Sequence, residues 1–112
     1  MDEGQDETTC DETTYERYRR ASGLLAGGSP DAAAILLAGL REEDPTSASV
    51  LEAYARALFD SHRYGAAAEA FGELVERSPA EDYAHFGLGL SLWRLQQFTS
   101  ARDHLAMAAV MR

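Results

Sequence analysis

The chain has 112 residues, enough for one domain with one core, and a formal net charge of −9. Ten basic residues face 19 acidic ones, which excludes a typical nucleic-acid binder. No apolar run reaches the roughly 20 residues of a membrane span, and the acidic N-terminus does not resemble a signal peptide. Cys10 is the single cysteine, so no internal disulfide is possible. Together these features predict a cytoplasmic protein with neither nucleic acid nor membrane as a partner.

The first 13 residues form an acidic segment. Its six acids are accompanied by no base, and they account for much of the net charge. These acids are Asp2, Glu3, Asp6, Glu7, Asp11 and Glu12. We predict a disordered tail over 1–13, because a polar, charged segment cannot bury enough apolar surface to fold. The tail either keeps the protein in solution or folds back over arginines of the folded part.

A first pair of helices is predicted after this tail. Thr13 and Glu16 have the spacing of a capping box, which predicts a helix beginning near Thr14. The segment 27–30, Gly-Gly-Ser-Pro, then predicts a tight turn. Ser29 is expected to cap the second helix, and Pro30 suits its first turn.

Two further pairs follow the same plan. Residues 61–63 and the glutamines at 96–97 mark the turns within them. Ser78 and Glu81 again have the spacing of a capping box, which predicts that Ser78 caps the first helix of the last pair. The scarcity of valine and isoleucine and the abundance of alanine and leucine favour helices over strands.

The predicted pairs are copies of one another. Pro45 and Pro79 lie 34 residues apart, and the same offset joins several series of apolar positions without an insertion. These series are Ala21, Ala55 and Gly89; Leu24, Leu58 and Leu92; Ala33, Ala67 and Ala101; and Leu37, Phe71 and Leu105. The spacing predicts three repeats, 14–47, 48–81 and 82–112, whose small residues let helices approach and whose large residues fill the space between.

A 34-residue period with this order of small and large apolar positions resembles the tetratricopeptide repeat. The second unit carries the resemblance best, with Leu51, Tyr54, Ala55, Leu58, Ala67, Phe71 and Pro79. The resemblance implies an all-α fold, a right-handed superhelical α-solenoid of about six helices in antiparallel pairs. Arg17 and Arg20 depart from the pattern, because the family has apolar residues at those two places.

In this family the first helix of every repeat lines a concave groove that contacts a peptide or helix of a partner protein. Carried over by position, the resemblance implies a groove that is rich in aromatic residues and arginine. Its members are Tyr15, Tyr18, Arg19, Arg56, Phe59, Tyr83, Phe86, Leu90, Trp93 and Arg94. The chain contains neither lysine nor asparagine, so the lysine-and-asparagine clamp that some members use for a C-terminal carboxylate is absent. Such a groove suits an apolar or amphipathic segment with some acidic residues.

Two alternatives compete with a peptide-binding groove. The aromatic residues could instead pack between neighbouring helices, and the arginines could be solvated. The last helix could also expose an apolar face formed by Leu105, Ala108, Ala109 and Met111, which would make a homodimer or dock on a larger complex. The sequence therefore predicts a binding module first and a structural subunit second.

No residue pattern indicates catalysis. His62, His85 and His104 do not have metal-ligand spacing with Cys10 or with one another. Cys10 has no base nearby in the sequence, which argues against a nucleophile. We therefore predict no metal, no cofactor and no enzymatic activity.

Overall fold

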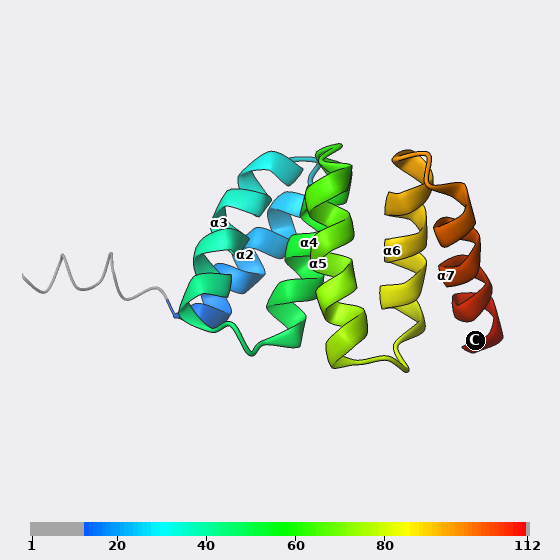
Figure 1. Cartoon of the computed structure of the whole chain (residues 1–112). Coiled ribbons are helices and arrows are strands. Elements are labelled where there is room, and N and C mark those ends of the chain that lie inside the picture. Colours follow the sequence, from blue (N-terminus) through cyan, green and yellow to red (C-terminus); the bar gives the residue numbers. More distant parts are fainter. Residues whose placement is uncertain (1–12, 112) are drawn as a thin grey trace, which may run out of the picture.

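The computed structural model describes residues 13–111. Over this range the chain consists of six α-helices joined by short turns, without strands (Figure 1). The helices are α2 (Thr14–Ala26), α3 (Pro30–Glu43), α4 (Ala48–Asp60), α5 (Tyr64–Arg77), α6 (Asp82–Arg94) and α7 (Phe98–Met111). The predicted all-α fold is confirmed. Apart from Thr13, the acidic segment 1–13 lies outside the described residues, and Cys10 lies there with it.

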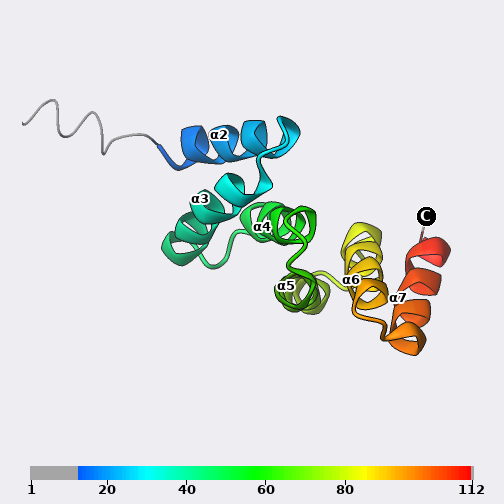
Figure 2. The same ribbon diagram turned by 90° about the horizontal axis from the view of Figure 1, so that it is seen from above.

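The helices repeat with the period of the sequence. Helices α2, α4 and α6 begin at residues 14, 48 and 82, and α3, α5 and α7 begin at 30, 64 and 98, so both series advance by 34 residues. Figure 2 shows the antiparallel pairs following one another from α2 and α3 to α6 and α7. Each helix packs on the next one in the chain, and α4 also contacts α2 and α6. This is the predicted helical-repeat solenoid. Within the described residues, none of the helices has the length and apolar character needed to cross a bilayer.

Hydrogen bonds at the helix ends test the predicted caps. The box at Thr13 is confirmed, because Thr13 Oγ1 accepts from the Glu16 N–H and Glu16 Oε1 accepts from the Thr13 N–H. Ser29 precedes α3 but makes no capping hydrogen bond with its side chain. The predicted cap at Ser78 is wrong, since α6 begins only at Asp82 and Ser78 instead ends α5.

The turns inside the three pairs share one conformation. Gly28, His62 and Gln96 occupy the same place in the repeat, and their φ angles are 85°, 65° and 65°. Glycine adopts this left-handed conformation without steric cost, whereas a residue with a Cβ pays roughly 1–2 kcal/mol. Gly28 therefore suits the first turn, whereas His62 and Gln96 strain the second and third turns.

Small residues bring the helices together as predicted. Ala21, Ala55 and Ala67 are fully buried. At Gly89 an added Cβ would lie 2.7 Å from Leu105 of α7, so a glycine is required for α6 and α7 to pack this closely. Leu37 and Phe71 are buried at the corresponding large positions, as expected for the core of the stack.

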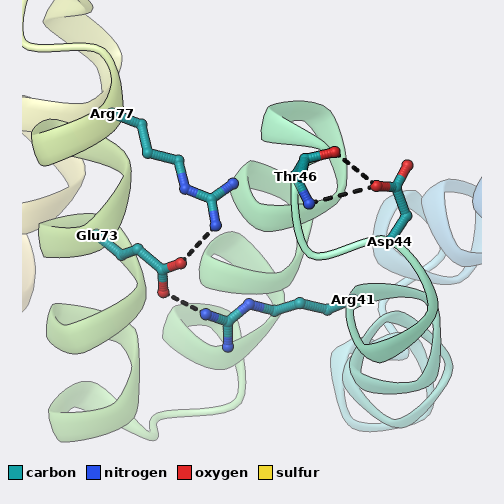
Figure 3. A network of polar contacts seen from close by, with 5 residues as sticks. All are labelled: Arg41, Asp44, Thr46, Glu73 and Arg77. Carbon is teal, nitrogen blue, oxygen red and sulfur yellow. Dashed lines mark hydrogen bonds and ion pairs between the residues drawn. The ribbon is translucent and has the colours of Figure 1, made fainter.

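Ion pairs on the outer side tie the repeats together. Glu73 of α5 binds Arg41 of α3 and, at 2.7 Å, Arg77 of its own helix (Figure 3). Arg41 also lies over the ring of Tyr54, 5.8 Å from its centroid. One carboxylate therefore links the first repeat to the second across the outside of the stack.

Arg17, one of the two departures from the repeat pattern, is accommodated by α3. Its guanidinium makes two hydrogen bonds to the Glu43 carboxylate, at 2.7 and 2.8 Å. This pairing holds the pKa of Glu43 below its usual value. Helix α2 packs on α3 with Ala21 fully buried between them, so the arginine does not prevent normal pairing of the first two helices.

Candidate functional site

The first helices of the three repeats enclose a hollow of about 250 Å³. Helix α2 lines one side, α4 the floor, and Tyr83 of α6 the other side. The lining residues are Tyr18, Ser22, Leu25, Ala26, Ser49, Glu52, Ala53, Arg56 and Tyr83. Because all nine come from α2, α4 and α6, the concave side implied by the repeat pattern is a real concavity. We refer to it as the polar hollow, since Glu52 and Arg56 stand in it.

A second hollow of about 170 Å³ adjoins the first and is more apolar. The two share Arg56 and Tyr83 as lining residues, so they lie side by side along α4 and α6, and we refer to them together as the groove. The remaining lining residues are Phe59, Asp60, Phe71, Phe86, Gly87 and Leu90. We refer to this part as the aromatic hollow.

Phe71 enters the aromatic hollow from α5, beneath the first helices. Gly87 makes this possible, because a Cβ at that position would lie 2.4 Å from the Phe71 ring. The Phe71 ring also meets Tyr83 edge to face, with centroids 6.0 Å apart. The hollow is therefore walled by rings from two repeats, a surface suited to an apolar side chain.

A third hollow of about 340 Å³ lies at the turn end of the groove, where Phe59 and Tyr64 pack edge to face at 5.2 Å. The guanidinium of Arg94 covers the Tyr64 ring at 5.4 Å from its centroid. Leu25 and Pro30 of the first repeat line the opposite side. This hollow continues the groove, since it shares Phe59 with the aromatic hollow.

The charged groups of the groove are arranged along α4. Arg56 lies 3.8 Å from Asp60, one turn further along the helix. Burial raises the pKa of the Glu52 carboxyl, the charge of Glu81 raises it further, and Arg56 partly opposes both. Burial likewise raises the pKa of the Tyr83 hydroxyl, with Arg56 acting in the opposite direction. The groove thus disfavours the ionised form of Glu52.

Seven of the ten residues predicted for the groove line these hollows. They are Tyr18, Arg56, Phe59, Tyr83, Phe86, Leu90 and Arg94. The other three do not. Tyr15 is exposed beside Arg19, whose guanidinium lies 5.9 Å from its ring centroid. Trp93 is 52% exposed and packs edge to face on Phe98 at 4.8 Å.

The predicted core position of Phe71 is confirmed, since the residue is 2% exposed, although it also lines the aromatic hollow; Tyr64, which lines the third hollow, is not among the predicted groove residues. A signal for Phe71 was present, because the repeat has leucine at the equivalent positions 37 and 105. Gly87 is likewise smaller than its equivalent, Ala53. The combination of a large residue on α5, Phe71, with a small residue on α6, Gly87, lets the phenylalanine ring line the aromatic hollow.

The predicted apolar face of α7 is only partly exposed. Ala108 is 1% exposed and buried within the chain, so its predicted place on an open face is wrong. Leu105 is half-buried against Gly89, and Met111 is also half-buried. Ala109 is exposed, and the larger exposed side chains are Met107 and Val110, the latter 83% exposed.

Two histidines join α6 to α7. The Nδ1 atoms of His85 and His104 lie 3.3 Å apart, and His85 Nε2 lies 2.9 Å from the Pro79 carbonyl oxygen. Because that oxygen can only accept, His85 Nε2 donates to it, and in a neutral His85 the Nδ1 atom then accepts the proton of His104 Nδ1. Burial lowers the pKa of His104, and His85 lowers it further. Among the described residues, no three histidine, cysteine or acidic side chains come together as metal ligands would.

A family model described as tetratricopeptide repeat matches residues 52–112, more than half of the chain. None of the curated proteins compared with the chain matches it significantly.

Solved structures share this architecture at low sequence identity. MamA from Desulfovibrio magneticus RS-1 is 18% identical, with a TM-score of 0.85, over 96% of this chain and 61% of that one. MamA AMB-1 gives the same identity and TM-score, over 96% and 64% of the two chains. The chain thus spans about three fifths of the MamA chains it matches. The second such repeat domain of Spaghetti (RPAP3), solved with the HSP90 peptide SRMEEVD, is 13% identical with a TM-score of 0.82, over 96% and 99%.

Proposed function

We propose that this chain, which belongs to the tetratricopeptide repeat family, acts as a non-catalytic adaptor that holds a peptide or helix of a partner protein in its groove. The observation that carries the proposal is that the polar and aromatic hollows lie side by side along α4 and α6, with Arg56 and Tyr83 lining both. Concave sites with aromatic walls and a few polar groups are suited to specific recognition. We assign the seven groove-lining residues to partner binding, together with Glu52.

The architecture of a known peptide binder supports this proposal. The RPAP3 domain that matches this chain over nearly its whole length was solved with a peptide bound. The present chain, however, contains no lysine and no asparagine with which to clamp a carboxylate. We therefore expect a partner segment held by its side chains rather than by its C-terminal carboxylate. A cytoplasmic location remains a prediction from the sequence.

A displayed library of random 12-residue peptides, panned against the protein, tests the proposal. We expect selected peptides to lose at least tenfold in affinity on Phe86→Ala, because Phe86 is partly exposed in the aromatic hollow. Ile35→Ala is the matched control, since Ile35 is 73% exposed on α3 and lines none of the three hollows. Failure to select any peptide, or equal losses in both variants, would overturn the proposal.

A second candidate function is self-association through α7, in a homodimer. The exposure of Met107 and Val110 on one helix favours it. Sedimentation velocity across micromolar concentrations checks this candidate. A dimer that Val110→Glu dissociates, while Glu76→Gln leaves it intact, would support it, and a monomer at every concentration would exclude it.

A further inference from the structure

The charged side chains of the groove differ in whether another side chain of the protein pairs with them. Arg56 is paired with Asp60, Arg94 lies on the Tyr64 ring, and Arg19 lies on the Tyr15 ring. Cation–π contacts of this kind stabilise a guanidinium by about 0.5–1 kcal/mol at exposed sites. Each of the three arginines that the sequence predicted for the groove thus has a partner within the chain, although Arg19 lines none of the hollows.

Glu52 is in the opposite situation. It lines the polar hollow, and within residues 13–111 it forms neither a hydrogen bond nor an ion pair. Glu52 is open to solvent on one side, yet partial burial and the nearby charge of Glu81 raise its pKa, and Arg56 only partly opposes them. A positive charge delivered into the hollow would offset both effects.

We propose that the groove selects a basic amphipathic segment, in which an apolar side chain fills the aromatic hollow and a neighbouring lysine or arginine pairs with Glu52. The inference rests on the proposed peptide-binding function. The two hollows share Arg56 and Tyr83, so ligand residues one or two positions apart reach both of them. The net charge of −9 favours the encounter with a basic segment.

The same arrangement rejects an acidic segment. Arg56 lines both hollows, and it lies one helical turn from Glu52 on one side and from Asp60 on the other. A ligand carboxylate approaching Arg56 therefore meets two like charges within about 6 Å of the same helix face. Like charges brought together in this way add a repulsive contribution to specificity.

Two labelled peptides that differ only in charge test the inference, GSRLWRLSGS and GSELWELSGS, measured by fluorescence anisotropy at 50 mM salt. We expect the basic peptide to bind at least tenfold more tightly. Glu52→Gln should remove most of that preference, since it deletes the charge while keeping the shape. Glu76→Gln is the matched control, because this exposed acid of α5 lines none of the described hollows and its loss changes the net charge equally.

The outcomes separate the inference from the function on which it rests. Equal binding of both peptides, with both weakened by Phe86→Ala, would leave the groove in place and overturn the charge preference. Tighter binding of the acidic peptide, or equal effects of Glu52→Gln and Glu76→Gln, would also overturn the preference. Binding of neither peptide would count against the groove function itself. Circular dichroism of each variant verifies that the helices remain intact.

Discussion

Helices α2 and α6 occupy the same place in the first and third repeats, yet their equivalent faces differ in burial: α5 covers the face of α6, and the face of α2 is exposed. Gly87 of α6 lies against the Phe71 ring of α5, and Ala84, one turn earlier, is fully buried. In α2 the equivalent positions hold Arg19 and Glu16, and both are exposed. Within the described residues, α2 packs on α3 and α4 alone. The same position in the repeat can therefore hold a charged residue where no other helix packs on it, and it needs a small apolar residue where another helix does.

A second pair of equivalent positions shows how polar groups are accommodated. Arg17 of α2 pairs with Glu43 at the surface, whereas His85 of α6 is buried and bonds to His104 and the Pro79 carbonyl. Both polar side chains replace an apolar residue of the repeat pattern. Each is tolerated because the following helix or the preceding turn supplies its hydrogen-bonding partners.

The largest effect is expected from removing the ring that α6 covers. Phe71→Ala should lower the free energy of unfolding by about 3–5 kcal/mol, since it leaves a cavity between α5 and α6. Arg19→Ala, at the exposed equivalent of Gly87 in α2, should change it by less than about 0.5 kcal/mol. Urea unfolding followed by circular dichroism measures both values. Similar losses in the two variants would contradict the comparison.

Glycines on the two helices should respond to the same substitution with opposite signs. Gly87→Ala should destabilise the protein by about 1–3 kcal/mol, because the new Cβ collides with the Phe71 ring. Gly23→Ala on α2 meets no atom within 4 Å, and better helix propensity should stabilise it by up to about 1 kcal/mol. Thermal unfolding of the two variants decides the point, and a shift of the same sign in both would refute it.

Relieving the strained turn of the third repeat should give a smaller gain in the free energy of unfolding. Gln96→Gly should stabilise the protein by about 0.5–1 kcal/mol, because φ is 65° there and glycine removes the steric cost of a left-handed residue. Part of that gain is offset by the greater entropy of glycine in the unfolded chain. Gly28→Ala in the equivalent first turn, where φ is 85°, should have the reverse effect. Chemical denaturation of both variants provides the measurement.

The smallest predicted effect is a pH dependence at the histidine pair. The folded-state pKa of His104 is lowered from its ordinary value of 6.5, so the unfolded chain binds more protons in this range. Stability contributed by the pair is therefore present above pH 6.5 and is lost as the pH falls below it. The loss ends once the pH has passed the lowered pKa, because His104 is then protonated in both states.

The variant His104→Asn isolates this contribution, since the amide keeps a donor for His85 Nδ1 but does not titrate. Melting temperatures between pH 8 and 5 should fall less steeply for the variant than for the unchanged protein. The Arg17–Glu43 pair provides an internal reference in another range, because a lowered carboxyl pKa costs stability only as the pH falls below about 4.5. Identical pH profiles above pH 5 would exclude a role for the histidines.

The sequence predicted the fold better than it predicted the local caps. The 34-residue period placed the helix starts, whereas the capping-box spacing of Ser78 and Glu81 was misleading. The Ser78 N–H bonds to Leu74 and ends α5, and the Glu81 N–H bonds back to the Ser78 carbonyl and closes a turn around Pro79. Stacking of α6 on α5 fixes where the helix starts, and it overrides a weak local motif.

By itself the sequence determined the repeat, the close approach of the helices and most of the groove wall, because residue size and helical spacing are properties of the chain read in order. Only the tertiary structure decided that Phe71 reaches the groove and that Ala108 is buried, since both depend on which helix lies opposite. The pairs Arg56–Asp60 and Tyr15–Arg19 are four residues apart on one helix, so helical spacing alone brings them together. The tertiary structure instead placed Arg94 of α6 on the ring of Tyr64 of α5, because that contact depends on how the second and third repeats stack.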